Sequence, residues 1–283
     1  MEWKRKHMDG KNAIQLKEKN GVYYFQFPLL EACAEVAHGF STRIGGVSKG
    51  EYASMNFSFT RGDDKEAVME NYRRMGEVLG MPWQRCVLSH QTHTVHVRRV
   101  TEADAGKGIC RERDYQDVDG LITNERQIPL VTFYADCVPL YFVDPVHHAI
   151  GLSHSGWRGT VSRMGRETLL AMHAAYGTDP GDVLACIGPS ICKDCYEVGE
   201  EVAMAFAESV QAPQLDSILK KQENGKYLLN LWKANERVLL EAGVRPEHLA
   251  VTDVCTKCNP DLLYSHRVMG DKRGNLAAFL MLK

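Results

Sequence analysis

The sequence lacks any apolar run long enough to cross a membrane. No stretch of 18 apolar residues occurs among its 283 positions, which excludes an ordinary transmembrane helix. The one basic cluster, at residues 4–7, is not followed by the apolar run of about 7–15 residues that a secretory signal peptide needs. We therefore expect a cytoplasmic protein with no membrane partner.

The chain also has little net charge. Its 34 Lys and Arg residues nearly balance 36 Asp and Glu residues, and the formal net charge is −2. This balance excludes a protein-wide basic field, so no nucleic-acid partner is expected. There is no internal repeat and no linker rich in Pro, Gly and Ser, and the 44% of hydrophobic residues is enough for a sizeable core. These features predict one domain over residues 21–283, preceded by a frayed segment at residues 1–20.

A disulfide framework is not expected. The nine cysteines are an odd number in a long chain without a signal peptide, which is typical of a reducing compartment. Cys33, Cys86 and Cys186 lie in apolar stretches and are expected to be buried as small apolar side chains.

Four more cysteines form two C-x-x-C pairs, Cys192/Cys195 and Cys255/Cys258. Two such pairs can build a closed zinc site. However, 59 residues separate Cys195 from Cys255, far more than in a zinc ribbon. The spacing therefore favours two pairs without a shared metal.

The hydrophobic pattern predicts an α+β fold. Helical spacing of apolar residues or strand-forming composition marks the expected elements. Helices are expected at 64–80, 162–176, 198–210 and 230–242, and strands at 22–28, 86–100, 119–123, 129–137, 139–144, 149–155, 183–189, 249–255 and 275–282. Because helices do not alternate strictly with strands, we expect a central mixed β-sheet covered by helices.

Three histidines stand three residues apart in the segment HQTHTVH: His90, His93 and His96. On a strand, residues three apart face opposite sides, so His93 would face away from the other two. One strand cannot direct all three side chains to one metal.

A cysteine and a histidine interrupt the apolar segment that follows. Cys137 ends one predicted strand, and His154 ends the next but one. They can form a nucleophile–base pair or be two ligands of zinc. With His93 they would supply three ligands and leave one position open, which is the pattern of catalytic zinc. Such a zinc makes hydroxide available near neutral pH.

Two arginines lie in glycine-containing loops, Arg43 in STRIGG and Arg158 in GWRGT. Guanidinium groups bind phosphate oxygens through paired hydrogen bonds, so both are candidates for holding an anion. Neither loop has the spacing of a nucleotide-phosphate loop.

Six motifs together resemble one known family. They are STRIGGVSKGEYASMNF (41–57), QTH (91–93), ADCVPLYFVDP (135–145), HSGWRG (154–159), GPSICKDCYEVG (188–199) and CTKCNPDLLYSHR (255–267). Their order is similar to that of the YfiH-type laccase-domain family, also called multicopper polyphenol oxidoreductase or purine nucleoside phosphorylase. The resemblance spans roughly residues 38–283.

The resemblance implies a single α+β domain similar to the cytotoxic-necrotizing-factor deamidases. It implies a metal site of His93, Cys137 and His154 that holds Zn²⁺, with Cu²⁺ possible. The implied activity is phosphorolysis of adenosine, inosine and 5′-methylthioadenosine together with deamination of adenosine. The partners would then be purine nucleosides and phosphate. The protein itself would be a monomer or a small homo-oligomer.

The resemblance also suggests roles for individual residues. Cys137, Asp136 and Arg158 would be catalytic, with Asp136 as a candidate proton shuttle. Substrate would bind to Arg43, Asn56, Tyr196 and Arg267.

The chain departs from the family pattern at Thr94 and His266, where glycine and tyrosine are frequent. These differences concern substrate preference more than the metal site.

Three other functions fit parts of the sequence. A copper polyphenol oxidase would suit the older family name, but multicopper sites are rich in His-x-His pairs and the eleven histidines here include none. A metal-free hydrolase would use Cys137 as nucleophile and His154 as base. In a non-enzymatic protein, the metal would only stabilise the fold.

Overall fold

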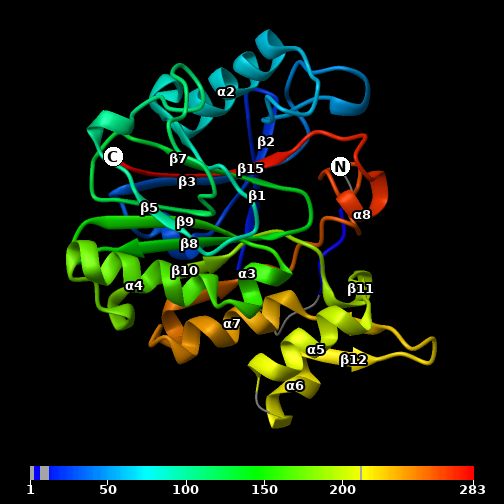
Figure 1. Cartoon of the computed structure of the whole chain (residues 1–283). Coiled ribbons are helices and arrows are strands. Elements are labelled where there is room, and N and C mark those ends of the chain that lie inside the picture. The colour runs from blue at the N-terminus through cyan, green and yellow to red at the C-terminus, as the bar shows by residue number, and fades with distance from the viewer. Residues whose placement is uncertain (1–2, 7–12, 211) are drawn as a thin grey trace.

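The computed structural model describes residues 3–6, 13–210 and 212–283. Its central feature is a pair of six-stranded sheets that lie face to face, with helices on both outer surfaces (Figure 1). The α+β class predicted from the sequence is confirmed, and the expected mixed sheet is divided between these two layers.

The first sheet has the strand order β1 (Gln15–Lys19), β2 (Val22–Gln26), β3 (Val36–Ser41), β15 (Leu276–Leu282), β7 (Leu130–Tyr134) and β4 (Val87–Leu88). The second has the order β14 (Leu249–Val251), β10 (Leu184–Ile187), β8 (Val138–Asp144), β9 (Ala149–Ser155), β6 (Gly120–Thr123) and β5 (Val97–Arg99). Both sheets are mainly antiparallel, with parallel pairs at β4–β7, β5–β6 and β10–β14.

A small third sheet and the helices complete the chain. The small sheet has the order β11 (Glu197–Val198), β13 (Tyr227–Leu229) and β12 (Leu219–Lys221). The helices are α1 (Pro28–Glu31), α2 (Lys65–Leu79), α3 (Trp157–Val161), α4 (Met164–Tyr176), α5 (Glu200–Ser209), α6 (Ala212–Ile218), α7 (Leu231–Glu241) and α8 (His266–Met269). No helix in the described part of the chain is long and apolar enough to cross a membrane.

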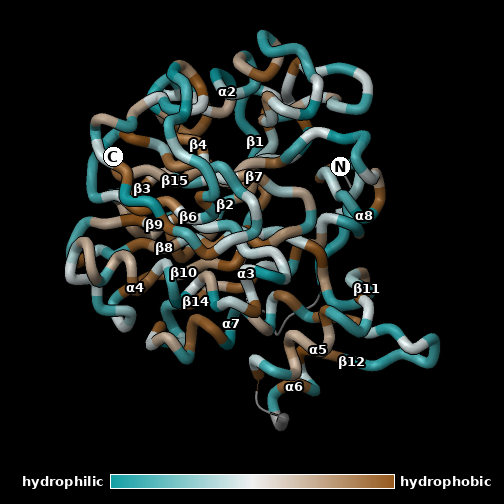
Figure 2. The backbone as a smooth tube through the Cα atoms, viewed as in Figure 1, coloured by the Kyte–Doolittle hydropathy of each residue, from teal (hydrophilic) through white to brown (hydrophobic). Residues whose placement is uncertain are grey.

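The main core lies between the two large sheets, where the backbone in Figure 2 is coloured hydrophobic along β8, β9 and β15. Two fully buried tyrosines join the sheets there. The Tyr141 hydroxyl on β8 donates to the Gly39 carbonyl on β3 at 3.1 Å, and the Tyr134 hydroxyl on β7 donates to the Ser153 carbonyl on β9 at 3.0 Å. Because a buried polar group is costly when unpaired, these bonds favour one alignment of the two sheets.

Helix α2 covers the outer face of the first sheet, and α4 and α7 cover that of the second. The sequence sets the limits of α2 directly. The Asp64 side chain accepts a hydrogen bond from the Glu66 N–H at its start, and Gly80 ends it in the left-handed region at φ 67°. Its buried side chains Val68, Tyr72 and Met75 follow helical spacing.

The predicted elements differ from the observed ones in several places, including the short helices α1, α3, α6 and α8, which the sequence pattern does not predict. The expected strand at 86–100 is wrong in its middle, because only Val87–Leu88 and Val97–Arg99 are strands and a loop joins them. Strand β3 was not predicted, since all six of its residues are buried and it shows no alternation of polar and apolar side chains. The small third sheet was also not predicted.

Part of the segment expected to be frayed is ordered. Gln15–Lys19 pairs with β2 along five residues. Arg5 forms an ion pair with Asp253 at 2.5 Å and a backbone bridge to Val254. Residues 1–2 and 7–12 of that segment lie outside the described residues.

The buried side chain of His38 on β3 makes stability depend on pH. Its Nε2 accepts a hydrogen bond from the Phe27 N–H at 2.8 Å, and burial lowers its pKa from 6.5 to about 3. The unfolded chain binds a proton at this histidine below about pH 6.5, whereas the folded chain does not. The stability that His38 contributes is therefore present above pH 6.5 and is lost as the pH falls toward 3.

We predict that His38→Gln makes stability less dependent on pH. As the pH falls from 7.5 to 5, the free energy of unfolding of the parent protein, measured with urea, should decrease by about 2 kcal/mol more than that of the variant. The control is His248→Gln, at a half-buried histidine whose Nδ1 contacts the Gly181 carbonyl. If the free energy of unfolding changes equally with pH in the parent protein and in His38→Gln, the prediction is wrong.

Candidate metal centre

Three side chains that are far apart in the sequence meet at one rim of the second sheet. His93 lies on the loop between β4 and β5, Cys137 directly precedes β8, and His154 lies on β9. One ligand atom from each lies within 4.8 Å of the others, and the Cys137 Sγ is 4.0 Å from the His93 Nε2. The antiparallel register places Pro139 opposite His154, so the residue before β8 arrives beside the end of β9.

The backbone at His93 is unusual because its φ is 67°, in the left-handed region that few residues other than glycine adopt. The carboxylate of Asp119 holds it there. This fully buried group accepts the backbone N–H groups of Thr92, His93 and Thr94 at 3.0–3.1 Å. The loop can turn His93 toward the other two side chains, which a continuous strand could not do.

The same carboxylate orients His154. The His154 Nδ1 lies 2.7 Å from the Asp119 Oδ1. With Nδ1 used in this bond, Nε2 is the ring nitrogen that remains for Cys137 or a metal. Carboxylate–histidine pairs of this kind are common behind metal ligands, where they set the tautomer and the ring orientation.

Gly156 provides the space that the three side chains need. A Cβ atom at this position would lie 3.0 Å from the His93 Cδ2 and 3.1 Å from the Cys137 Sγ. Any larger residue would crowd two of the three donors, which explains the glycine that follows His154 and Ser155.

The electrostatics favour a thiolate at Cys137. Burial opposes its ionisation, but the neighbouring His154 and His93 outweigh burial and lower its pKa to about 6. Burial likewise opposes protonation of His154, yet the Cys137 thiolate and the Asp119 carboxylate raise its pKa to about 9. Thiolate and imidazolium thus stabilise each other, and a metal ion would replace the imidazolium proton as the counter-charge.

These donors fit a metal ion that keeps an open position. One thiolate and two imidazoles suit zinc, and the same set also binds copper. His154 is buried, Cys137 is half-buried and His93 is exposed. The cluster is therefore reached from solvent on the His93 side, where a water or substrate could complete the coordination.

The other two histidines of HQTHTVH serve the neighbouring turn. The His90 Nδ1 accepts the Asp117 N–H at 3.2 Å, and the His96 Nδ1 lies 3.1 Å from the Asp117 carbonyl. His266 is exposed, and its Nδ1 lies 3.0 Å from the Gly270 carbonyl. None of the three joins the group of His93, Cys137 and His154.

Asp136 precedes Cys137 but is already committed to other partners. Its carboxylate accepts the Thr256 hydroxyl at 2.5 Å and the Arg267 backbone N–H at 2.7 Å. This geometry ties the Cys137 turn to the 256–267 segment. It leaves the carboxylate poorly placed to shuttle protons.

Three of the expected substrate-binding or catalytic residues gather near Cys137. The Arg267 guanidinium lies 5.1 Å from the Tyr196 ring centroid. Burial raises the pKa of Tyr196 to about 12, and charges at Cys137, Arg267 and Arg158 also act on this phenol. Arg158 is exposed at the start of α3, 4.3 Å from the Trp157 ring, and has no ion pair with any described residue.

Arg43 and Asn56 have structural contacts instead. Two nitrogens of Arg43 donate to the Ala53 carbonyl at 2.8–2.9 Å, and a third donates to the Pro260 carbonyl at 3.0 Å. Asn56 is fully buried, and its amide bonds to Ser58, Asp63 and Asn275. In this conformation Asn56 offers no free polar atom to a ligand.

The sequence did not indicate two charged residues of this region, Asp119 and Arg273. Asp119 stands in an ordinary strand-like stretch, DGLIT, so nothing marked its carboxylate as the partner of His154. Arg273 is 6% exposed, its Nε has no hydrogen-bond partner among the described residues, and its pKa is lowered to about 10 by burial. The charges of Arg61, Asp136 and Cys137 also act on the Arg273 guanidinium.

Fold and site together define an α+β protein with a solvent-accessible centre of two histidines and one cysteine. The chain belongs to the multi-copper polyphenol oxidoreductase laccase family, whose model matches residues 37–283. The resemblance found in the sequence is therefore confirmed.

Named relatives include purine nucleoside phosphorylase YlmD of Bacillus subtilis, 36% identical over 255 residues that cover 88% of this chain and 89% of the relative. Adenosine deaminase RL5, from an unknown prokaryotic organism, is 32% identical and covers 85% of this chain and 92% of its own. The crystal structure of the hypothetical protein YfiH from Bacillus licheniformis matches with a TM-score of 0.87 at 29% identity, covering 95% of this chain and 99% of that one.

We predict that Asp119→Asn weakens metal binding about 10- to 100-fold, because the amide can no longer accept from His154 and three backbone N–H groups together. Zinc affinity should be measured by competition with a chromophoric chelator. Asp117→Asn is the matched control, since this exposed carboxylate also accepts from Thr92 but does not touch His154. Equal losses in both variants would show that Asp119 only shapes the loop.

Proposed function

We propose that this chain is a metal-dependent purine nucleoside enzyme. It would cleave adenosine, inosine and 5′-methylthioadenosine with phosphate and would also deaminate adenosine. The observation that carries this proposal is the group of His93, Cys137 and His154, open to solvent on one side and close to Tyr196 and two exposed arginines. The names of the relatives, purine nucleoside phosphorylase and adenosine deaminase, support the same reaction class.

Zinc is the metal that we propose for the centre, held by His93, Cys137 and His154. When bound, it would supply Lewis acidity and activate water for attack on the purine. Asp119 keeps the His154 proton on Nδ1, so that Nε2 stays available.

The remaining residues would handle phosphate and the base. Arg158 and Arg267 have exposed guanidinium groups that can hold phosphate oxygens. Tyr196 can stack on the purine, and its hydroxyl keeps its proton at neutral pH because its pKa is about 12. It can therefore donate a hydrogen bond to the departing base. Arg43 and Asp136 would act indirectly, by positioning the loops around the site.

The alternatives have less support. A multicopper oxidase needs several copper sites, and the described residues offer two possible metal groups, of which one contains histidine. A metal-free cysteine hydrolase is favoured by the low pKa of Cys137. Activity toward nucleosides that disappears with a chelator and returns with zinc would exclude the hydrolase.

We predict that purified protein incubated with adenosine and phosphate produces adenine, inosine or both. Cys137→Ala should reduce both products at least about 100-fold, since it removes a ligand of the centre. The control is Cys110→Ala, at an exposed thiol outside the site. Chromatography separates adenine, which reports glycosidic cleavage, from inosine, which reports deamination. Absence of both products from zinc-loaded, folded parent protein would refute the proposal.

We predict that replacing a phosphate-binding arginine impairs phosphorolysis more than deamination. Arg158→Gln is expected to raise the KM for phosphate about tenfold or more, because a charge-assisted hydrogen bond contributes about 1.5–3 kcal/mol. The rate of deamination should change much less, because that reaction uses water rather than phosphate. Arg166→Gln, on the exposed side of α4, serves as the control. If both reactions fall equally, Arg158 does not act through phosphate.

A further inference from the structure

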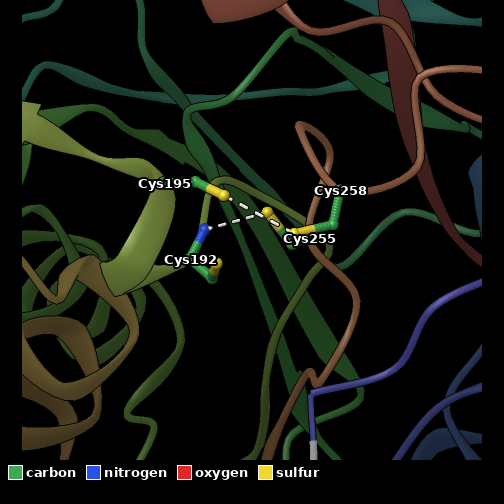
Figure 3. A group of neighbouring side chains, drawn as sticks. All are labelled: Cys192, Cys195, Cys255 and Cys258. Atoms are coloured by element: carbon green, nitrogen blue, oxygen red, sulfur yellow. Dashed lines mark hydrogen bonds between the residues drawn. The ribbon is translucent and has the colours of Figure 1, made fainter.

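The two C-x-x-C pairs, 59 residues apart in sequence, meet in the folded chain (Figure 3). Cys192 and Cys195 come from the loop after β10, and Cys255 and Cys258 come from the segment after β14. One atom from each of the four side chains lies within 4.8 Å of the others. The long sequence separation favours two separate pairs, and the fold brings them together instead.

The pairing of two strands explains how the cysteines meet. Strands β10 and β14 are neighbours and run parallel, with Ile187 opposite Val251. Their carboxyl ends therefore reach the same edge of the sheet, and each is followed within a few residues by a C-x-x-C pair. A further bridge between Ser190 and Cys255 keeps the two segments side by side.

The spacing of the sulfurs suits a tetrahedral metal. Zinc–sulfur bonds of about 2.3 Å place the sulfurs of a four-cysteine site about 3.8 Å apart. Here the Cys195 and Cys258 sulfurs are 3.5 Å apart. A disulfide would need about 2.05 Å. Cys192 and Cys255 are buried and the other two are half-buried, so none of the four is exposed, whereas the centre at His93 has one exposed donor.

The surroundings also suit bound thiolates. The backbone N–H of Cys192 donates to the Cys255 sulfur at 3.3 Å. The backbone N–H of Cys195 donates to the Cys192 carbonyl at 3.1 Å, which closes the first C-x-x-C turn. The Lys6 ammonium is paired with Asp194 at 3.0 Å, and its positive charge also acts on Cys192 and Cys258.

We propose that Cys192, Cys195, Cys255 and Cys258 bind a structural zinc ion in a closed four-thiolate site. This second site is distinct from the centre at His93, Cys137 and His154, and it does not depend on the proposed function. Its ligands occupy all four positions, so it leaves none for substrate.

The zinc would stabilise the lining of the first centre. The loop with Cys192 and Cys195 continues into Tyr196, and the segment with Cys255 and Cys258 contains Thr256, which donates to Asp136 beside Cys137. The Ile191 N–H also donates to the Asp136 carbonyl at 3.0 Å. A metal joining these two segments would hold Tyr196 and the Cys137 turn in a fixed relation.

The test separates the two sites by starting from Cys137→Ala, which disables the first one. This variant, purified under reducing conditions with zinc, should retain about one zinc per chain, surrounded by four sulfurs in X-ray absorption spectra. Adding Cys192→Ser and Cys258→Ser should reduce the zinc to near zero, whereas adding Cys110→Ser should leave it unchanged. Zinc bound mainly through nitrogen or oxygen, or no zinc in Cys137→Ala, would overturn the proposal.

A second measurement uses the unmodified protein, in case the double-serine variant does not fold. In zinc-loaded protein, the four cysteines should resist alkylation while Cys110 reacts at once, and a strong chelator should expose all four to the reagent. Peptide mapping by mass spectrometry identifies each modified residue. Equal alkylation of the four before and after chelation, or disulfide-linked peptides in protein purified under reducing conditions, would rule out a structural zinc site.

Discussion

The candidate centre depends on one buried carboxylate. Asp119 bonds to the His154 ring on one side and to three consecutive backbone N–H groups on the other. A buried charge needs such partners, because desolvation without them would be costly. The same group therefore holds His93 in its left-handed conformation and sets the tautomer of His154. Without this carboxylate, neither the His93 backbone nor the His154 ring would be held in the orientation that faces Cys137.

The two-sheet architecture supplies the frame around this interaction. The β8–β9 pairing brings the turn before β8 and the end of β9 to one rim, and the buried hydroxyls of Tyr134 and Tyr141 attach this sheet to the other. Tyr134 also lies 5.6 Å from the His154 ring. The rim is thus packed against the core on one side, while Arg158 on α3 and Arg267 on α8 are exposed.

The two groups of cysteine or histidine side chains differ in donor number and in exposure. The centre at His93 has three donors and a side open to solvent, which suits chemistry on a bound molecule. The group of four cysteines has four donors, none of them exposed, which suits a structural metal. Asp136 connects the two through Thr256 and Ile191, so the order of one region is linked to the order of the other.

The sequence by itself determined the α+β class, the four longest helices, most of the strands, the family, and the trio His93, Cys137 and His154. These rest on local composition, spacing and ordered motifs, which do not need long-range contacts. It did not predict the loop at His93, because a strand-like composition conceals the left-handed turn that Asp119 stabilises from 26 residues away. The role of Asp119, the burial of Asn56 and the meeting of the four cysteines were decided by tertiary structure. Each depends on which strands become neighbours, and strand pairing is a property of the whole fold rather than of any segment.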